Sequence, residues 1–593
     1  MNQPITQPVK SGCADTEHLF NSHDGSELFY RHWAATEQIT GKAKQAVVMF
    51  HRGHEHGGRM GHLVAELSLS HCDFFAWDAR GLGRSAGERG HAESFGSMVQ
   101  DIDCFIRHIC QHHDLKPQDI VVLGQSVGAV MLTTWVHDYA PDIRAMILAA
   151  PAFKVKLYVP FARQMIALRQ KISGVFTVNS YVKAHYLSHD PKRIESYNND
   201  PLITRPIASN ILLDLYQAAE RCITDAHTIT TPTLTLVSGS DWVVEKAPQY
   251  EFMARLGSRD KQLIELPGFF HDTLGELHRE QALKEIRRFI NNSFAATEDN
   301  PDLKQADKQG QGYQNFQSLK QPVTGIQRYY WDLLKQMTKL GAKFSEGYKL
   351  GQTTGFDSGS TLDYVYQNQP QGKGWLGRII DNSYLNSIGW RGIRQRKTNL
   401  EQLINQAINQ LQQNNLPIHI ADIAAGQGRY ILDAIEPRKT EIESLLLRDF
   451  SDINVTAGNQ ALQQRGFDGF SEFQQGDAFD QASVAAIEPK PTLGIVSGLY
   501  ELFSDNNMIR RSLAGLAQAI KSNGYLIYTN QPWHPQQELI ARVLTSHQDG
   551  QQWVMRCRSQ REMDQLIEEA GFEKCGQLID QWGIFSVSIA RRK

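Results

Sequence analysis

Ser126 is the residue of this sequence best suited to act as a nucleophile. It stands in Gly124-Gln125-Ser126-Val127-Gly128, directly after an apolar run at 120–123 and before an apolar helical run at 129–136. A G-x-S-x-G pattern in that context predicts a sharp strand-to-helix turn that projects the serine hydroxyl above a sheet. Its chemistry would be covalent, because such a serine attacks a carbonyl carbon and forms an acyl-enzyme.

A serine hydroxyl reacts at neutral pH only when a histidine takes its proton and an acid orients that histidine. Asp241 follows an apolar strand, and His271 lies in the loop after the next one. The resulting chain order, Ser, Asp, His, is the order used by proteins with a G-x-S-x-G turn. His227 precedes the acid and His278 falls inside a predicted helix, so both are less well placed; Asp225 is the alternative acid.

Stabilising the oxyanion of such a reaction takes two backbone amides. Val127 supplies the amide after the nucleophile, and we expect Gly53, in the loop after the apolar run 46–50, to supply the second. His51, His54 and His56 of the same loop offer an alternative interpretation as metal ligands. A loop that turns its backbone toward an oxyanion does not readily converge three imidazoles, so we predict no metal here.

Three stretches of the first half, at 51–59, 78–85 and 124–128, resemble the monoacylglycerol lipase and lysophospholipase branch of the α/β-hydrolases. The resemblance covers about residues 18–292 and implies an α/β-hydrolase fold with a helical cap that cleaves esters of small, lipid-like molecules. One position departs from the family, which reads His-Gly where this chain has His51-Arg52. The Arg52 side chain could narrow the acyl pocket or meet a charged headgroup.

A glycine-rich turn marks the second half. Asp422 ends an apolar strand, and Gly426 and Gly428 lead from it into a helical segment. Glycines at such a turn let the backbone approach a ligand at a helix N-terminus. Ile431 stands where the dinucleotide fingerprint has its third glycine, which lowers the expectation of NAD.

The same segment resembles the first motif of class I S-adenosylmethionine-dependent methyltransferases. In that fold an acid at the end of the second strand holds the ribose hydroxyls and a third-strand acid reaches the adenine amine; Asp449 and Asp477 match these positions. Over residues 325–593 the chain resembles a bacterial family of methyltransferase domains joined to such hydrolases. The resemblance implies S-adenosylmethionine as cofactor, held by Asp422, Gly426, Gly428, Asp449 and Asp477. Asn530, Trp533 and His534, after the fifth strand, are candidates to meet an unknown methyl acceptor.

The elements that must position these residues form two series. Short apolar runs alternate with helical periods from residue 18 to 294 and again from 418 to 590, which predicts two α/β domains with mainly parallel sheets, the second Rossmann-like. We expect a tail at 1–17, a cap inserted at about 152–229 and a polar linker at 295–325. The second domain would span 326–593 and begin with a helical lead-in to about residue 416.

Composition excludes several other classes of protein. The chain of 593 residues has a formal charge of −3, so no overall field attracts it to nucleic acid or anionic lipid. Its seven cysteines lack metal-ligand spacing and are typical of reduced core thiols. We expect no transmembrane segment, no signal peptide and a cytoplasmic location. The basic residues Arg391, Arg394, Arg396 and Lys397 suggest a solvated helix face or, alternatively, a site for a phosphate or carboxylate acceptor.

These observations favour a bifunctional enzyme, in which ester hydrolysis and methyl transfer act on related molecules. An active hydrolase with a regulatory domain that only binds S-adenosylmethionine is the alternative. A scaffold without activity is disfavoured by the intact set of Ser126, Asp241 and His271.

Overall fold

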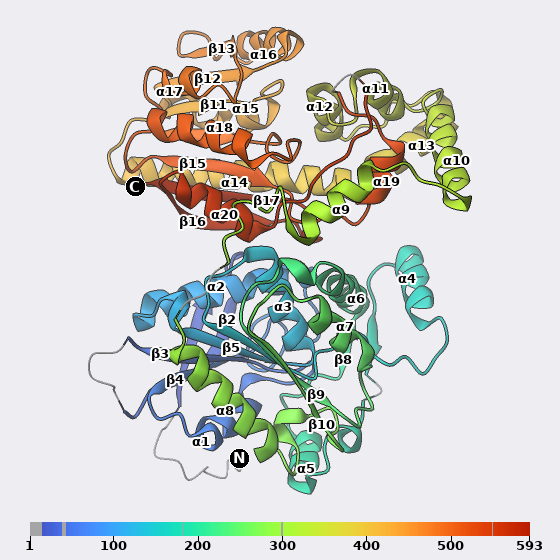
Figure 1. Cartoon of the computed structure of the whole chain (residues 1–593), viewed down its shortest axis with the longest axis vertical. Coiled ribbons are helices and arrows are strands. Elements are labelled where there is room, and N and C mark those ends of the chain that lie inside the picture. Colours follow the sequence, from blue (N-terminus) through green and yellow to red (C-terminus); the bar gives the residue numbers. More distant parts are fainter. Residues whose placement is uncertain (1–14, 38–42, 181, 298–300, 548–549) are drawn as a thin grey trace. The chain divides into compact units, whose positions relative to one another are not determined.

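The computed structural model describes residues 15–37, 43–180, 182–297, 301–547 and 550–593. The chain divides into two compact units, Met1–Pro301 and Asp302–Lys593, each built around its own sheet (Figure 1). No helix in these ranges is long and apolar enough to cross a membrane. Most of the expected tail lies outside the described residues, but its last two residues already belong to the first strand.

The N-terminal unit contains an eight-stranded sheet in the order β1-β2-β4-β3-β5-β6-β9-β10. Six strands from β4 to β10 in this order are parallel, and β1 and β2 add an antiparallel edge. The strands are β1 (Thr16–Asn21), β2 (Glu27–Trp33), β3 (Gln45–Phe50), β4 (Cys72–Trp77), β5 (Ile120–Gln125), β6 (Ala145–Ala149), β9 (Thr233–Ser238) and β10 (Lys261–Leu266).

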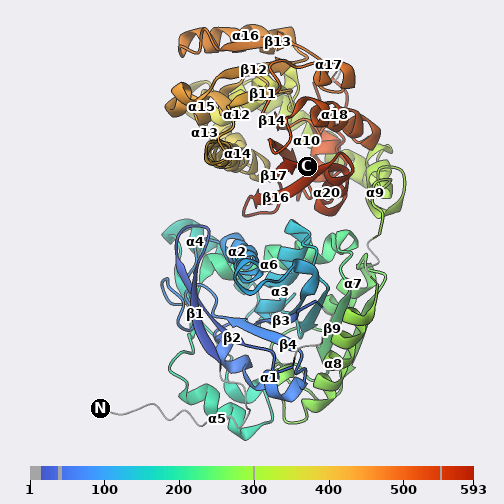
Figure 2. The same cartoon turned by 90° about the vertical axis from the view of Figure 1, so that its left-hand side faces the viewer.

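Helices cover both faces of this sheet, as two buried faces require. α1 (His62–Leu67) and α8 (Glu280–Ala295) pack on one face, where every second strand residue joins their apolar side chains in a single core. α2 (Phe95–His113) and α3 (Val127–Tyr139) lie on the opposite face (Figure 2). α7 (Ala247–Arg255) follows β9. The predicted α/β-hydrolase architecture is confirmed.

An inserted cap separates β6 from β9. It consists of α4 (Ala162–Ser173), α5 (Pro191–Asn199) and α6 (Ser209–Thr224), together with a small antiparallel pair, β7 (Thr177–Asn179) and β8 (Pro206–Ala208). α6 packs against α3. The cap is therefore not purely helical.

The described part of the segment expected to be a polar linker, 295–297 and 301–325, contains more regular structure than its composition suggests. α8 ends at Ala295, and α9 occupies Gly310–Lys320. Phe316 and Leu319 of α9 are buried, while the carboxylate of Asp307 accepts the Asn506 N–H at 3.0 Å. Two buried apolar side chains and hydrogen bonds to other parts of the C-terminal unit thus hold this segment, which has little apolar surface of its own.

The C-terminal unit holds a seven-stranded sheet in the order β13-β12-β11-β14-β15-β17-β16. The first five strands are parallel, and β17 runs antiparallel to both of its neighbours. Chain order reverses between β11 and β14, and at such a switch point the carboxyl ends of the strands leave a crevice for ligands. The strands are β11 (His419–Asp422), β12 (Ser444–Asp449), β13 (Ser471–Gln475), β14 (Leu493–Val496), β15 (Tyr525–Asn530), β16 (Phe572–Ile579) and β17 (Ser586–Arg592).

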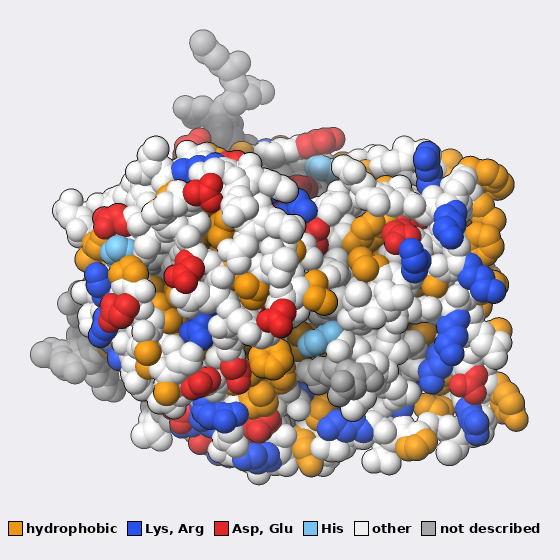
Figure 3. Space-filling view, turned by 90° about the horizontal axis from the view of Figure 1, so that it is seen from above, with side chains coloured by type: hydrophobic (Ala, Val, Ile, Leu, Met, Phe, Trp, Pro, Cys, Tyr) orange, Lys and Arg blue, Asp and Glu red, His pale blue; other side chains and the backbone are white. Residues whose placement is uncertain are grey.

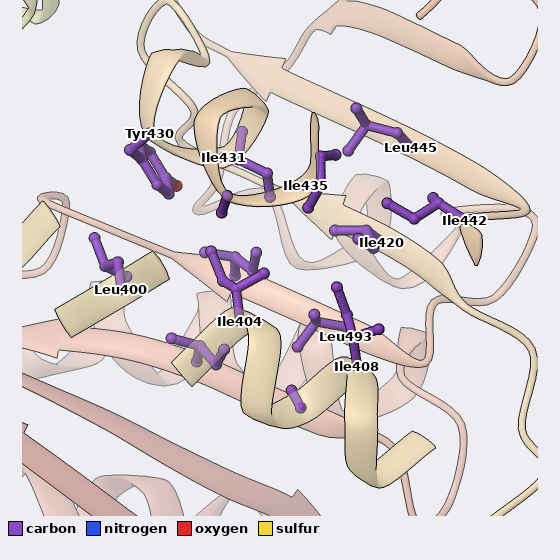
Figure 4. Packing of buried hydrophobic residues seen from close by; sticks show 14 of the residues in the cluster. Leu400, Ile404, Ile408, Ile420, Tyr430, Ile431, Ile435, Ile442, Leu445 and Leu493 are labelled. Carbon is purple, nitrogen blue, oxygen red and sulfur yellow. The ribbon is translucent and has the colours of Figure 1, made fainter. Parts of the chain in front are cut away.

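Apolar side chains of α14 (Ile388–Gln413) and α15 (Arg429–Ile435) form the core on one face of this sheet. Leu400, Ile404 and Ile408 of α14 point toward Ile431 and Ile435 of α15 and toward the strands (Figure 4). α18 (Asn506–Ala519) and α20 (Gln560–Glu569) cover the other face together with α17 (Gln481–Ala485); α16 (Asp452–Gln464) packs beside β13. This is the predicted Rossmann-like arrangement with its terminal antiparallel hairpin.

The helical lead-in precedes α14. It comprises α10 (Ile326–Gly341), α11 (Glu346–Thr354), α12 (Gly359–Gln367) and α13 (Gly374–Leu385). Residues of α11, α12 and α13, but none of α10, share a separate aromatic core with Trp390 and Phe585. α19 (Gln537–Val543) packs against α9 and α10. The cysteines that the structure describes are all free, and Cys575 is exposed, contrary to the core position expected of it.

Candidate functional sites

Ser126 occupies a strained turn between β5 and α3. Its backbone adopts φ 55° and ψ −116°, a conformation that a residue with a side chain rarely adopts outside functional sites. The two glycines of the motif make the turn possible. A Cβ on Gly128 would lie 2.4 Å from the carbonyl oxygen of His51, and one on Gly124 would lie 2.9 Å from Cα of Ala129.

Three residues from distant loops meet at this turn. His271 Nε2 lies 2.7 Å from Oγ of Ser126, and His271 Nδ1 lies 2.8 Å from Oδ2 of Asp241. All three side chains are buried. The structure therefore joins the predicted serine, histidine and acid in one chain of hydrogen bonds.

The carboxylate of Asp241 is held charged. Burial opposes ionisation, but the His271 imidazole and the backbone N–H groups of Val243 and Val244 outweigh it, so the pKa lies below its usual value. Asp225, the alternative acid, lies elsewhere: its carboxylate contacts His137 Nε2 at 2.8 Å. Burial lowers the pKa of His137, but the hydrogen bonds that it donates to the carboxylates of Asp138 and Asp225 raise it to about 9.

The predicted oxyanion residues border the nucleophile. Gly53 and Val127 line the same cavity as Ser126, and a Cβ on Gly53 would lie 3.1 Å from Cγ2 of Val127. This cavity has a volume of about 470 Å³ and extends from the triad beneath the cap. Its lining is dominated by aliphatic side chains, among them Leu82, Met98, Val155, Ile166, Ile207, Ile211, Leu212 and Leu215.

The histidines of the 51–59 loop bind three separate partners. His51 Nε2 accepts the Ala79 N–H at 3.0 Å, His54 Nδ1 donates to the carbonyl of Thr204, and His56 Nε2 contacts the Asp200 carboxylate. Within the ranges that the structure describes, no group of three or more histidine, cysteine or acidic residues could hold a metal ion.

Arg52 also lines the cavity, and its guanidinium belongs to a buried charge network. Nε and one terminal nitrogen donate to the two carboxylate oxygens of Glu55, each at 2.7 Å, and that terminal nitrogen lies 3.5 Å from Asp272. The other terminal nitrogen is buried without a hydrogen-bond partner. The Arg52 side chain is therefore held in one position at the cavity wall, where it narrows the cavity.

In the C-terminal unit, the glycine-rich turn lies at the switch point of the sheet. Gly426 has φ 57° and Gly428 has φ 77°, so both occupy the left-handed region that favours glycine. Nothing lies within 4 Å of a Cβ built on Gly426, so open space adjoins the turn. Asp422, at the end of β11, is fully buried; its carboxylate accepts the hydroxyl of Tyr430, and burial raises its pKa to about 7. The buried Asp422 side chain thus supports the glycine-rich turn from the side of the sheet.

Asp449, at the end of β12, faces the same turn. Its Oδ2 accepts the N–H of Gly426 at 2.9 Å, and its Oδ1 accepts hydrogen bonds from Ser451 and Asn454. Asp477, after β13, is exposed, and its carboxylate accepts the N–H of Phe479 at 2.8 Å. Both acids stand at the carboxyl ends of adjacent parallel strands, as the sequence predicts.

A helix of the lead-in borders the turn. Asp363 of α12 forms an ion pair with Arg429 at the start of α15, and Leu362 and Tyr366 approach the same loop. The space left between them is about 40 Å³. No pattern in the sequence indicates that α12 lies beside this turn.

A larger cavity of about 450 Å³ adjoins this space and shares Leu362 and Arg396 with it. Its walls are mainly aromatic and aliphatic, and they include Tyr348, Trp390, Ile393, Leu539, Trp553, Met555 and Phe585. Arg396 lines it fully buried, contrary to the expected solvated face, and lies 3.5 Å from Glu501. Arg396 Nε and Glu501 Oε2 are both buried without a hydrogen-bond partner.

The other basic residues of this helix differ from Arg396. Lys397 pairs with Glu401 and Asp433, Arg394 donates to the carbonyl of Leu385, and Arg391 covers the ring of Trp582. They do not form one site.

His534 also lines the larger cavity. Its Nδ1 accepts the N–H of Gln536 at 3.0 Å, which leaves the proton of the neutral imidazole on Nε2. Burial lowers its pKa to about 4, so the ring is neutral at physiological pH. Asn530 lies apart, with its side-chain amide donating to the carbonyl of Arg558.

Comparison with known proteins covers both units. A family model described as “Putative methyltransferase” matches residues 286–592, and one described as “Serine aminopeptidase, S33” matches residues 41–278. The protein YnbC of Escherichia coli (strain K12), described as uncharacterized, is 52% identical over 580 residues, which are 97% of this chain and 98% of YnbC.

Two further relatives are each similar to less than half of this chain. A monoacylglycerol lipase of Mycolicibacterium smegmatis is 25% identical over 277 residues, 46% of this chain and 96% of the lipase. The phospholipase YtpA of Bacillus subtilis (strain 168) is 24% identical over 246 residues, 41% of this chain and 93% of that protein. Because the first family model covers more than half of the chain, the chain belongs to that methyltransferase family, and its N-terminal α/β-hydrolase unit is similar to the S33 hydrolases of the second model.

Proposed function

We propose that the N-terminal unit is a serine hydrolase that cleaves carboxylic esters with an apolar acyl chain, of the monoacylglycerol or lysophospholipid class. The observation that carries the proposal is the hydrogen-bonded chain of Ser126, His271 and Asp241 at one end of an aliphatic cavity. A cavity of this lining favours an acyl chain over a polar group, because apolar burial is its main source of binding free energy.

The reaction then follows from the distances. His271 Nε2 takes the proton of Ser126 as Oγ attacks the ester carbonyl carbon, and Asp241 stabilises the imidazolium that forms. The amides of Gly53 and Val127 donate hydrogen bonds to the oxyanion. His271 returns the proton to the leaving alcohol, and a water activated by the same imidazole releases the acid.

Ester cleavage fits the cavity better than removal of an amino-terminal residue from a peptide. An aminopeptidase must bind the substrate's ammonium group, for which a carboxylate is the natural partner. Among the described residues that line the cavity there is no aspartate or glutamate. Its two arginines, Arg52 and Arg80, are each paired with acids and cannot bind an ammonium group.

A fluorophosphonate probe and p-nitrophenyl esters test this proposal. The full chain should be labelled by the probe and should hydrolyse the esters, and Ser126→Ala should abolish both while the melting temperature stays the same or rises. Ester hydrolysis that survives in Ser126→Ala would remove this serine from the mechanism.

We further propose that the C-terminal unit binds S-adenosylmethionine and transfers its methyl group. The residues present fit this cofactor in kind. Asp449 offers carboxylate oxygens that would accept hydrogen bonds from ribose hydroxyls, and Asp477 offers a carboxylate for the adenine amine. Gly426 and Gly428 would allow the ligand to approach the backbone closely. The unpartnered atoms of Arg396 and Glu501 suit the carboxylate and ammonium of its amino-acid part.

S-adenosylmethionine supplies an electrophilic methyl group, so the protein's contribution is mainly to orient the acceptor and exclude water. The aromatic cavity next to the turn would hold the acceptor. His534 would donate a hydrogen bond from Nε2 to an acceptor oxygen. The presence of this cavity favours methyl transfer over a purely regulatory role, because a domain that only binds the cofactor needs no second cavity for a methyl acceptor. The resulting protein is bifunctional, and we place it in the cytoplasm.

Calorimetric titration of the full chain tests cofactor binding. S-adenosylmethionine and S-adenosylhomocysteine should bind, and NAD should not. Asp449→Ala should weaken binding by about 1–3 kcal/mol, since buried ligand hydroxyls lose a charged acceptor. Ser126→Ala is the control and should bind unchanged. A flat titration with millimolar cofactor and a folded protein would refute the methyltransferase proposal and leave the hydrolase proposal intact.

A further inference from the structure

Helix α10 carries an exposed apolar stripe that no described element of the C-terminal unit covers. Ile326, Tyr329, Tyr330, Leu333, Met337 and Leu340 are all exposed. Their spacings of three, one, three, four and three residues place them on one side of a helix. α10 packs against α11 and α19, and Trp331 and Leu334, on its other side, are partly buried. The stripe is therefore a second apolar face.

Neighbouring residues extend this face. Phe344 follows α10 and is exposed, and its carbonyl accepts the N–H of Lys373 just before α13. On the first turns of α13, Trp375, Leu376 and Ile379 are exposed as well. We call the exposed apolar residues of α10, Phe344 and these three residues the α10 surface.

Cationic side chains flank the α10 surface. On α10, Arg328, Lys335 and Lys339 recur at intervals of seven and four residues, which places them in one row, about 100° around the helix axis from the nearest edge of the apolar stripe. Lys343, Lys373 and Arg378 continue the positive charge toward α13. The single acidic residue of α10, Asp332, pairs with Arg328 at 3.5 Å. Figure 3 shows hydrophobic and basic side chains gathered along the edge of the molecule where α10 lies.

We propose that the α10 surface binds the interface of a membrane that contains anionic lipid. An apolar helix face with tyrosine and tryptophan beside lysine and arginine is the composition of helices that lie in the headgroup region, where aromatic rings enter the boundary and the cations meet phosphate. The net charge of the whole chain is negative, so the attraction is local. Each cation close to an anionic membrane surface adds to the binding free energy, whereas the apolar side chains of the α10 surface alone would bind weakly.

The cap of the N-terminal unit offers the rival surface. On α4, Met165, Leu168 and Ile172 are exposed, and Arg163 and Lys171 lie on the same helix. The two surfaces provide matched substitutions: Met337 is 59% exposed and Met165 60%, while Leu333 is 57% exposed and Leu168 61%. A double change to glutamate on either helix therefore costs similar exposed apolar area, and glutamate is tolerated in both helices.

Co-sedimentation of the full chain with vesicles tests the proposal. The protein should bind vesicles of phosphatidylcholine with about 30% phosphatidylglycerol, and should bind pure phosphatidylcholine vesicles at least about tenfold less. Leu333→Glu with Met337→Glu should lower the partition coefficient at least about tenfold, and Lys335→Gln with Lys339→Gln should lower it similarly at low salt. Met165→Glu with Leu168→Glu should leave more than about half of the binding.

Three results would overturn the proposal. The wild-type protein does not sediment with anionic vesicles; the α4 pair abolishes binding while the α10 pair retains it; or the wild-type protein is a dimer by analytical ultracentrifugation that the α10 pair turns into a monomer, which would make the surface a contact between copies. Circular dichroism melts of each variant verify that it is folded, so that lost binding reports on the surface.

Discussion

At the scale of single residues, two aspartates of the N-terminal unit each contact a histidine, and we expect one of them to serve catalysis and the other to serve stability. Asp241 orients His271 beside the nucleophile, whereas Asp225 contacts His137 on the far part of α3. Asp241→Asn should lower kcat for p-nitrophenyl esters on the order of 10⁴-fold, because the amide favours the wrong tautomer of His271. Its melting temperature should change little.

Asp225→Asn is the matched control. We expect nearly full ester hydrolysis at 25 °C and a free energy of unfolding reduced by about 2 kcal/mol, since a charged hydrogen bond is lost. The pKa of His137 is raised in the folded state, so this contribution is complete below the pKa of the unfolded histidine and disappears as pH rises through about 9. Denaturant titrations at pH 6 and pH 9.5 measure the difference. If Asp225→Asn were the inactive variant, the assignment of the acid would be wrong.

Substitution of Asp422 should have the opposite effect and stabilise the protein. Its folded-state pKa is raised to about 7, so folding binds a proton between the unfolded value and pH 7, and stability falls as pH rises through that window. Asp422→Asn removes this dependence while its amide oxygen can still accept the Tyr430 hydroxyl. The variant should therefore gain melting temperature relative to the wild-type protein between pH 5 and pH 8. A constant difference across that range would contradict the raised pKa.

At the scale of elements, α4 forms part of the cavity wall, and this makes acyl-chain length adjustable. Ile166 lines the cavity, whereas Leu168 of the same helix is exposed. Ile166→Trp should shorten the cavity and lower kcat/KM for a dodecanoate ester at least about tenfold relative to the acetate ester, because the added ring occupies the volume of several methylene groups. Leu168→Trp is the control, and its ratio of the two substrates should remain that of the wild-type protein.

Elements also explain which parts of the molecule were predictable. The order of Ser126, Asp241 and His271, each after a short apolar run, indicated which loops meet, because parallel strands end at one edge of a sheet. Local patterns could not indicate α12, whose Asp363 contacts Arg429 far along the chain. Arg396 was misread for the same reason: a cation on an amphipathic helix is usually solvated, and its burial depends on Glu501 from another loop. The helix α9 was missed because only two of its apolar residues, Phe316 and Leu319, are buried, and hydrogen bonds from the distant Arg542 to its last turn complete its attachment.

At the scale of the whole molecule, two sheets with separate cores should unfold in two calorimetric transitions. S-adenosylmethionine at 100 times its dissociation constant should stabilise the unit that binds it by about 2.7 kcal/mol. Only the transition of the C-terminal unit should then move to higher temperature, and Asp449→Ala should reduce the shift. Movement of both transitions by the same amount would mean that the units unfold together.

The position of β17 in its sheet determines when the C-terminal sheet can be completed as the chain is synthesised. This strand is formed by residues 586–592 and lies between β15 and β16. During translation the N-terminal sheet can close once β10 has emerged, while β15 and β16 each keep an open edge until Arg592 is made. Unpaired strand edges on nascent chains can pair with strands of other chains and cause aggregation. Ribosome pausing or premature termination after Ile579 should therefore yield aggregates that still contain a folded, active hydrolase.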